Sequence, residues 1–490
     1  MSRRSAETAG AVVLALGAVV LWALTRTYPN YDSYYHLVWG RELLSGAAPT
    51  FEAYAAPTQH PLYVALGALL SVLGEGADRA LVLVCLLSHA ALVFGAYRLG
   101  RAVFGPWPGV LAALFVGASA SFLLYAARAY VDAPFLALVV WVAVLVAEAP
   151  RSATGPMALL VLAGLLRPEA WVLGVLYWLW LGPRRPAPAA AALAAPLVWA
   201  LVDLVATGDP LHSFNATTEL ADDLRREQGL RAVPGSFVSF IAATVRPPVA
   251  LLALAGMALA VWRLGWARSR VPLALVGAGV ATFLGTGVLG LSILPRYLTV
   301  PAVALCVFAG YALAGFTTLQ PADPLRRRWQ RAAAAAAVAG VVVVVVLAPT
   351  LARVSAELRF IRVSHDGLVG LLDDPRVRSG LRCGPLTFPN YRLVPDARWH
   401  LDLPRARVTA RSARRRPYGV AIFALTPKGL RRFGFADGAS SATNIPDPGY
   451  APLARNDRFS AYARCPAGRS LSQASPSAPT AAGSAPERSG

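Results

Sequence analysis

The stretch YPNYDSYYHLVWGRELLSG, residues 28–46, follows the first apolar segment of the chain, residues 11–25. It places a carboxylate, Asp32, just beyond the end of that segment. The residues after Asp32 are amphipathic and rich in tyrosine, and tyrosine and tryptophan favour the headgroup layer of a bilayer. The stretch therefore predicts a helix that lies along a membrane surface, with a carboxylate at its start.

The composition places the rest of the chain in a bilayer. The 490 residues are 56% hydrophobic and only 15% charged, and the mean hydropathy is +0.51. A soluble core of this size could not hide so much apolar surface. Apolar runs long enough to cross the hydrocarbon layer predict about eleven transmembrane helices. They lie near residues 10–27, 79–97, 107–125, 132–148, 154–166, 169–182, 188–206, 248–264, 271–291, 296–316 and 331–351.

Arginine placement predicts the orientation of these helices. With a cytoplasmic N-terminus, the arginine-bearing loops at 98–101, 151, 184–185, 263–270 and 326–331 all fall inside, as the positive-inside rule requires. The long segments 28–78 and 207–247 and everything after Arg353 then fall outside. No small-residue cleavage site follows the first apolar run, so we interpret it as a retained helix. The predicted location is the cytoplasmic membrane, with a transmembrane domain over 1–352.

One segment allows two interpretations. Residues 154–182 could form a single span, balanced by a full span from His60 to Gly74, or two short half-spanning helices. A single span would bury Arg167 and Glu169 at the bilayer centre, which costs at least about 2.5 kcal/mol for each charge. Pro168 breaks a helix at the same place. We therefore prefer two half-spans that meet near the outer surface.

The region 353–466 is much less apolar and contains short β-like runs such as 418–425, so it predicts a small extracytoplasmic mixed α/β domain. Cys383 and Cys465 bracket it, and we predict that they form a disulfide in an oxidising compartment. The domain is basic, so anionic lipid headgroups or an acidic envelope polymer are its expected neighbours. Residues 467–490 are rich in Ser, Pro, Ala and Gly and predict a disordered tail.

The net charge of +20 comes almost wholly from arginine, because Lys428 is the only lysine. These arginines sit mainly between apolar segments, where they orient helices, so nucleic-acid binding is not expected.

Four further motifs accompany the first one: HPLY at 60–63 before a short apolar helix, YAARAYVD at 125–132, GLLRPEAW at 164–171 and PRYL at 295–298. In this order the motifs resemble the GT-C superfamily, the multi-spanning glycosyltransferases that use polyprenyl-phosphate sugars. That superfamily includes oligosaccharyltransferases, protein O-mannosyltransferases and lipid A aminoarabinose transferases. The resemblance covers roughly residues 8 to 316. It implies an all-α polytopic membrane fold and an inverting transfer of a hexose or pentose to an envelope acceptor.

The resemblance also implies roles for particular residues. Asp32 is the candidate general base, because a carboxylate in reach of the acceptor hydroxyl can take its proton. Arg128, Arg167 and Arg296 are candidates for the lipid phosphate, since guanidinium groups grip phosphate oxygens in pairs. Further candidates for binding the lipid phosphate or the sugar are His36, His60, Asp132, Glu169 and Tyr297. Asp32 and Asp132 could together hold Mg²⁺ or Mn²⁺, but the second carboxylate that the oligosaccharyltransferases carry is absent, so we predict no metal.

Each candidate also has a purely structural interpretation. Asp32 could cap a surface helix that begins at Ser33. Arg128 and Asp132 could form a helical i,i+4 pair. Arg167 and Glu169 could simply end a helix hairpin, Arg296 could be an interfacial residue that reaches the headgroups, and His60 could be structural.

Two other functions remain open. The chain could be a transporter or flippase for an amphipathic lipid, in which case intramembrane charges would line a pathway. It could also be an inactive scaffold whose C-terminal domain binds envelope polymer. The polar motifs gather on one face and few charges lie inside the helices, and this pattern favours an enzyme.

Overall fold

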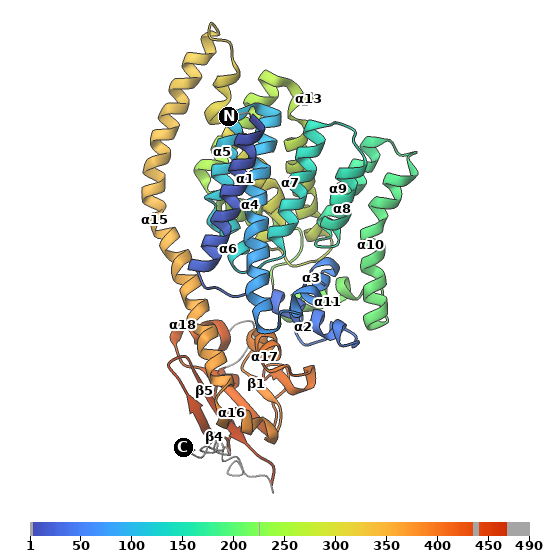
Figure 1. Ribbon diagram of the computed structural model, residues 1–490, viewed down its shortest axis with the longest axis vertical. Coiled ribbons are helices and arrows are strands. Elements are labelled where there is room, and N and C mark those ends of the chain that lie inside the picture. The colour runs from blue at the N-terminus through green and yellow to red at the C-terminus, as the bar shows by residue number, and fades with distance from the viewer. Residues whose placement is uncertain (1–2, 225, 435–440, 468–490) are drawn as a thin grey trace, which may run out of the picture. The chain divides into compact units, whose positions relative to one another are not determined.

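The computed structural model describes residues 3–224, 226–434 and 441–467. The chain divides into two compact units, residues 1–365 and 366–490, and helix α15 passes from one to the other. The first unit is built almost entirely of helices (Figure 1). Its α-helices are α1 Arg3–Leu24, α2 Tyr31–Leu44, α3 Pro61–Ser71, α4 Ala77–Phe104, α5 Pro106–Gly117, α6 Ala120–Ala127, α7 Asp132–Glu148, α8 Thr154–Gly164, α9 Glu169–Leu181, α10 Pro186–Thr207, α11 His212–Asp223, α12 Val233–Val245, α13 Pro247–Val288, α14 Thr299–Ala314 and α15 Pro324–Leu372.

A helix occupies each of the eleven apolar stretches, but not every helix is long enough to cross a membrane. Among the described residues, five helices are long and apolar enough to cross a membrane, or six if the bent pair α5 and α6 counts as one span. The chain is thus a multi-pass membrane protein, and the figure of eleven stays a prediction. The two helices predicted at 248–264 and 271–291 both lie within α13, as two helical segments on either side of a break at Gly265. Gly265 has φ 76°, a conformation that suits glycine because it lacks a Cβ atom.

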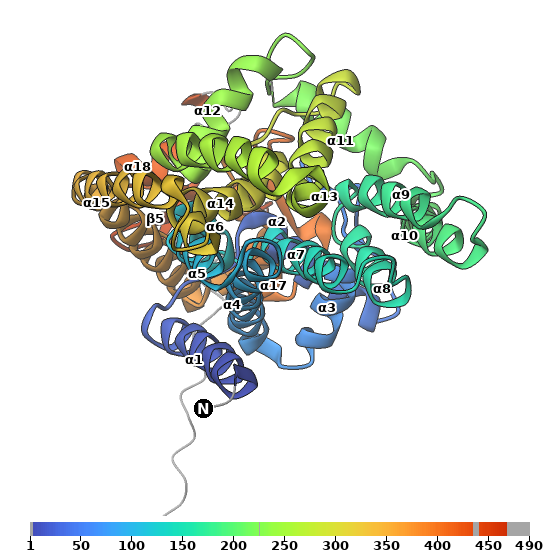
Figure 2. The ribbon, with the colours of Figure 1, turned by 90° about the horizontal axis from the view of Figure 1, so that it is seen from above.

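Helix α14 forms the centre of the first unit, where it packs against α13, α5 and α4 (Figure 2). Nearly all of its side chains are buried inside the protein. Helices α8, α9 and α10 pack together to one side of that centre, and α8 also packs against α7. Helices α8 and α9 make an antiparallel hairpin. The Tyr177 hydroxyl, near the end of α9, donates a hydrogen bond of 2.5 Å to the Ser152 carbonyl, just before α8 begins. Two short helices thus occupy residues 154–182, as the preferred interpretation predicted.

Helix α2 differs from the surface helix predicted for it. Its aromatic side chains Tyr34, Tyr35 and Trp39 are fully buried, so they do not lie in a headgroup belt. The reason is a close approach of α2 to α3 at two glycines. A Cβ atom on Gly40 would lie 2.2 Å from the Ala68 nitrogen, and one on Gly67 would lie 2.3 Å from the His36 carbonyl oxygen. The backbones therefore meet, and the aromatic face of α2 becomes part of the core.

The second unit has a five-stranded sheet in the order β2-β1-β3-β5-β4. Strands β1 and β2 and strands β1 and β3 pair in parallel, whereas β3, β5 and β4 are antiparallel. The fully buried central strand β3 matches the β-like run at 418–425. The helices and strands here are α16 Pro375–Gly380, β1 Leu386–Phe388, α17 Val394–Leu401, β2 Val408–Ala410, β3 Gly419–Ala424, α18 Pro427–Gly429, β4 Ala451–Arg455 and β5 Phe459–Arg464.

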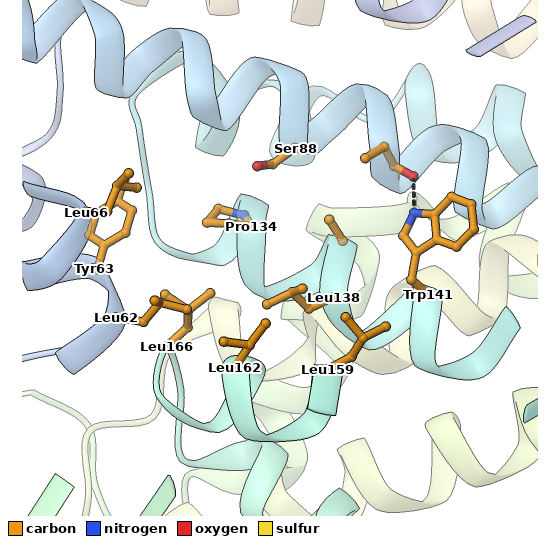
Figure 3. Close-up of a pocket in the computed structure, with 12 residues that line it drawn as sticks. Leu62, Tyr63, Leu66, Ser88, Pro134, Leu138, Trp141, Leu159, Leu162 and Leu166 are labelled. Carbon is orange, nitrogen blue, oxygen red and sulfur yellow. Dashed lines mark hydrogen bonds between the residues drawn. The ribbon is translucent and has the colours of Figure 1, made fainter. Parts of the chain in front are cut away.

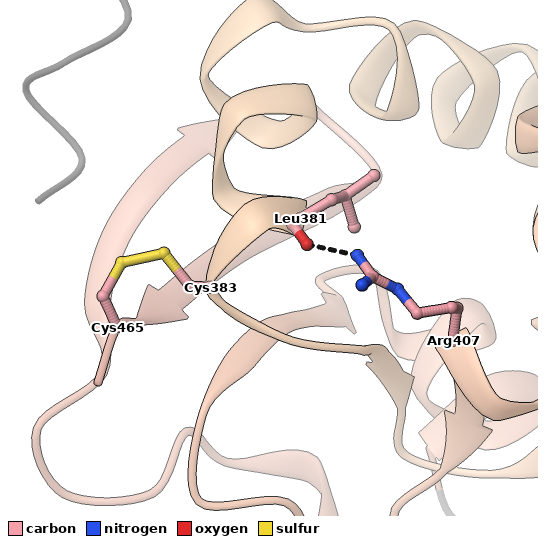
Figure 4. Close-up of a disulfide and its surroundings, with 4 residues drawn as sticks. All are labelled: Leu381, Cys383, Arg407 and Cys465. Atoms are coloured by element: carbon pink, nitrogen blue, oxygen red, sulfur yellow. Dashed lines mark hydrogen bonds between the residues drawn. A yellow bond between two sulfur atoms is a disulfide. The ribbon is translucent and has the colours of Figure 1, made fainter. Parts of the chain in front are cut away.

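The predicted disulfide joins Cys383 to Cys465 and so ties the start of the sheet domain to the end of its last strand (Figure 4). Arg407 donates to the Leu381 carbonyl beside it. Apart from Ala467, the predicted disordered tail lies outside the described residues.

Candidate active site

Asp32 lies in the first turn of α2, but it does not cap that helix. The cap is Asn30, whose side-chain oxygen accepts hydrogen bonds from the backbone nitrogens of Asp32 at 2.7 Å and Ser33 at 3.3 Å. An amide at this position satisfies the free N–H groups of the first turn. The structural interpretation of Asp32 as the cap is therefore wrong, and its carboxylate is free to face other elements.

That carboxylate meets Arg296, which is 264 residues further along the chain. Arg296 sits in the short 3₁₀ turn Pro295–Leu298 between α13 and α14, and its Nη1 lies 3.2 Å from Asp32 Oδ2. About a quarter of each side chain is exposed, 24% for Arg296 and 28% for Asp32. The pair is accessible and joins two of the sequence motifs.

A second, more deeply buried ion cluster lies beside the first. Arg167, in the turn between α8 and α9, contacts the carboxylates of Asp132 and Glu169. The Asp132 side chain is fully buried and that of Arg167 is 4% exposed. Arg167 also lies over the ring of Tyr297, with 5.3 Å between the guanidinium carbon and the ring centroid. Asp132 thus pairs with Arg167, and the i,i+4 pair with Arg128 is not the arrangement that forms.

Arg128 fixes the backbone of the two residues that precede α2, Pro29 and Asn30. It caps the end of α6, and its Nη2 donates to the Pro29 carbonyl at 3.0 Å. The Arg128 carbonyl in turn accepts the Asn30 backbone nitrogen at 2.8 Å. The next carbonyl, that of Ala129, accepts hydrogen bonds from the hydroxyls of Ser33 and Tyr63. The YAARAYVD motif thus fixes the segment that carries Asp32.

Two histidines pack together behind Asp32, in the connection between α1 and α4. The rings of His36 and His60 are stacked, with centroids 5.1 Å apart and an interplanar angle of 11°. His36 Nδ1 lies 2.6 Å from the Asp32 carbonyl oxygen. Burial lowers the pKa of His36 from 6.5 to about 4, and burial together with the positive charges of Arg296 and Arg167 lowers the pKa of His60 in the same direction. Both rings are therefore neutral at neutral pH.

These shifted histidines predict a loss of stability in acid. Between pH 6.5 and about 4 the unfolded chain binds protons that folded His36 cannot, so the free energy of unfolding decreases as the pH falls through this window. We expect His36 alone to lower it by about 2 kcal/mol between pH 7.5 and pH 5, with a further loss of the same sign from His60. Thermal unfolding of the detergent-solubilised protein should show this fall in wild type and a smaller one in His36→Asn. An equal fall in both proteins would show that His36 is not responsible.

A cavity of about 710 Å³ brings many of these residues to one wall. Its charged and polar wall includes His60, Arg167, Glu169, Arg296 and Tyr297. The second long loop predicted to lie outside contributes Ser213, Phe214 and Thr217 of α11, whereas its acidic residues Glu219, Asp222 and Asp223 are exposed to solvent. Asp32 does not line this cavity itself but contacts Arg296, which does. Asp132 and His36 likewise contact the lining residues Arg167 and His60, whereas Arg128 is not among the lining residues.

A second cavity, of about 610 Å³, lies on the other side of the α8–α9 turn (Figure 3). Its wall is almost entirely apolar and comes from α3, α4, α7, α8 and the α8–α9 turn, with Leu62, Pro134, Trp141, Leu162 and Leu166 among the lining residues. Leu166 lines this apolar cavity, and the next residue, Arg167, lines the charged one. The α8–α9 turn therefore contributes neighbouring residues to both cavities.

Asp32 and Asp132 are the two carboxylates at which the sequence allows a divalent cation. Each carboxylate is held by a different arginine, so the two do not make a ready donor pair. Among the described residues, no group of three or more His, Cys, Asp or Glu side chains is placed to hold a metal ion.

Sequence reasoning missed several residues of this site. Asn30 was not recognised as the cap, although asparagine is a favoured cap residue. Trp171 ends the GLLRPEAW motif but was given no role of its own, and nothing local marks Trp199, which also lines the cavity of about 710 Å³. Asp203 is a single charge inside the apolar stretch 188–206, and the sequence alone gives it no role. It proves to accept hydrogen bonds from the side chains of Gln59 and Ser213, at 3.1 and 2.9 Å.

Comparisons with known proteins show the fold. No family model matches the chain, and no curated protein sequence matches it. Among solved structures, ArnT from Cupriavidus metallidurans bound to undecaprenyl phosphate aligns with a TM-score of 0.55 at 14% identity, over 92% of this chain and 97% of that one. The apo form of the same protein aligns with a TM-score of 0.56 at 14% identity, over 94% and 98%. The chain has the fold of ArnT, and this confirms the predicted all-α polytopic membrane fold with a small C-terminal domain.

Proposed function

We propose that this GT-C-fold membrane protein transfers a hexose or pentose from a polyprenyl phosphate carrier to an envelope acceptor, with inversion at the anomeric carbon. The observation that carries the proposal is the accessible contact between a carboxylate, Asp32, and a guanidinium, Arg296, at the edge of one cavity. A base for the acceptor and a cation for the phosphate are the two groups that this reaction needs. The same fold holds undecaprenyl phosphate in the ArnT crystal structure.

Arg296 is the proposed phosphate ligand. Of the three candidate arginines it is the one that both lines the cavity and pairs with a single, partly exposed carboxylate. A phosphate that enters competes with Asp32 for the guanidinium, since both anions accept from the same N–H donors. Binding of the carrier therefore releases the Asp32 carboxylate beside the reacting sugar.

Asp32 then acts as the general base. The acceptor hydroxyl gives its proton to the Asp32 carboxylate while its oxygen forms a bond to the anomeric carbon. On the other side of that carbon the bond to the phosphate oxygen breaks, and polyprenyl phosphate leaves with its charge balanced by Arg296. The atoms and charges balance without a further reactant.

Arg167 and Arg128 have supporting roles in this proposal. Arg167 is already held between Asp132 and Glu169, so its charge is neutralised before any phosphate arrives. It shapes the cavity and positions Tyr297 through the contact of its guanidinium with the ring. Arg128 keeps the Pro29–Asn30 backbone in place and so fixes the start of α2.

The isoprenoid chain has an apolar route into this cavity. Val172 of α9 and Leu193 and Leu197 of α10 line the cavity, and they are also 40%, 55% and 64% exposed. In a membrane, such exposed apolar side chains on helices embedded in the bilayer contact lipid. A carrier can therefore enter sideways from the bilayer, with its phosphate at Arg296 and its chain against α9 and α10.

We place the reaction on the extracytoplasmic face of the plasma membrane. Arginine ion pairs that involve the predicted inside loops, Arg98 with Glu148 and Arg263 with Asp323, join helix ends remote from α2 and α3 (Figure 1). The disulfide in the second unit supports an oxidising compartment for that domain.

Binding of the carrier tests the proposal directly. Wild-type protein should bind undecaprenyl phosphate and release it from a radiolabelled sugar donor when membrane extract supplies acceptors. Arg296→Met should weaken binding of undecaprenyl phosphate by about 10- to 100-fold, because a charge-assisted pair of hydrogen bonds is lost. Arg231→Met removes an exposed arginine from the second long loop and should leave binding unchanged. Equal affinity in both variants, or movement of intact donor across vesicles without sugar release, would contradict the proposal.

A further inference from the structure

The main cavity has an aromatic wall that the reaction described above does not use. Trp171, in the first turn of α9, lies edge-on to Trp199 of α10, with centroids 5.6 Å apart and an interplanar angle of 84°. Trp199 in turn lies edge-on to His60 at 5.7 Å. His60 stacks on His36, which is one helical turn beyond Asp32. Four rings thus lead from the α8–α9 turn to the helix of the proposed base.

The two tryptophans are held in fixed positions. The Trp171 indole nitrogen donates to the Gly164 carbonyl at 3.0 Å, at the end of the partner helix α8. Trp199 is 3% exposed, so it supports Trp171 from behind, while Trp171 stays partly exposed at the cavity. A rigid, partly exposed indole beside polar groups is the surface on which the apolar C–H face of a sugar ring packs.

We propose that Trp171, supported by Trp199, is the platform for the sugar of the donor, and that it makes the site prefer the sugar-bearing carrier over the bare one. This inference rests on the proposed function. The sugar is bonded directly to the phosphate, so a phosphate at Arg296 places the sugar ring in the same cavity. The proposed reaction requires the anomeric carbon to lie within reach of Arg296 and Asp32, and Trp171 and Trp199 line the same cavity as Arg296.

Asp203 supplies the neighbouring polar edge. Its carboxylate lines the cavity below Trp199 on α10 and accepts from the Ser213 backbone and hydroxyl, both at 2.9 Å. The hydroxyls of Thr58 and Thr217, 2.7 Å apart, line the same part of the cavity. Hydroxyl and carboxylate groups around an aromatic face are the partners that a polyhydroxylated ring requires.

The test compares two carriers on matched variants. Binding of undecaprenyl phosphate and of a panel of undecaprenyl-phosphate hexoses and pentoses is measured on the whole protein, together with Trp171→Phe and Trp171→Leu. Both substitutions lose the hydrogen bond to Gly164, but only phenylalanine keeps an aromatic face. Trp266→Leu, at an exposed tryptophan of α13, serves as the control.

We expect Trp171→Leu to weaken binding of the preferred sugar-bearing carrier roughly tenfold, with bare undecaprenyl phosphate within about twofold of wild type. Trp171→Phe should retain most of the preference, and Trp266→Leu all of it. Equal losses for both carriers in Trp171→Leu, or no sugar-bearing carrier that wild type prefers over the bare one, would overturn the platform. Failure of wild type to bind undecaprenyl phosphate at all would instead overturn the proposed function.

Discussion

Replacing Asp32 by Asn should lower the rate of sugar transfer by about 10²- to 10⁴-fold, the usual contribution of a general base. The amide has nearly the same shape as the carboxylate, but it cannot take a proton from the acceptor hydroxyl. Because Asn30 and not Asp32 caps α2, the substitution should leave the helix intact. Release of radiolabelled sugar in a single turnover, with donor and enzyme premixed, measures the chemical step.

The control for this variant lies on the same helix. Glu42→Gln makes the same change from carboxylate to amide. The Glu42 carboxylate accepts hydrogen bonds from the Thr50 backbone nitrogen and hydroxyl, and Glu42 does not line the cavity. The transfer rate of this variant should stay within about twofold of wild type. Asp32→Asn should also still bind undecaprenyl phosphate, since Arg296 remains and loses a competing anion. Transfer at the wild-type rate in Asp32→Asn would remove this residue from catalysis.

Local sequence signals were sufficient for the helices and for the sheet domain. Apolar runs between charged loops marked the helical stretches, because the bilayer requires long apolar segments whatever their neighbours are. Pro168, flanked by Arg167 and Glu169, predicted the α8–α9 hairpin from the cost of burying charge, and the hairpin formed. The disulfide between Cys383 and Cys465 followed from the position of the two cysteines around one domain.

Contacts between distant segments could not be predicted in this way. Arg128 and Asp132 are four residues apart, yet Asp132 pairs with Arg167, because the break after α6 and the turn before α9 bring the α8–α9 turn to the start of α7. The aromatic face of α2 looked like a surface feature, since its composition suits a headgroup layer. Its burial depends on Gly40 and Gly67 facing each other across two helices, and such a match is visible only once both helices are placed.

Removing the buried cation of the second cluster should cost about 3 to 5 kcal/mol of folding free energy. In Arg167→Met the fully buried Asp132 loses its ionic partner, and its other oxygen, Oδ2, already has no hydrogen-bond partner among the described residues. Glu169 loses the same guanidinium. We expect the temperature at which half of the detergent-solubilised protein aggregates to fall well below the wild-type value. Arg98→Met, which breaks the more exposed pairs with Glu148 and Glu7, should cost about 1 kcal/mol or less.

A double variant distinguishes the loss of the ion pair from the loss of the packing contacts of Arg167. If an uncompensated carboxylate causes the instability, Arg167→Met with Asp132→Asn should recover much of the stability lost in Arg167→Met, because no isolated charge then remains at that position. If the guanidinium matters mainly as the group that packs on Phe135 and Tyr297, the second substitution should recover nothing. Recovery of stability without recovery of sugar transfer would show that the ion cluster is needed for the reaction as well as for folding. Arg167 would then be a positioning residue, since it holds Tyr297 and Glu169 at the wall that Arg296 shares.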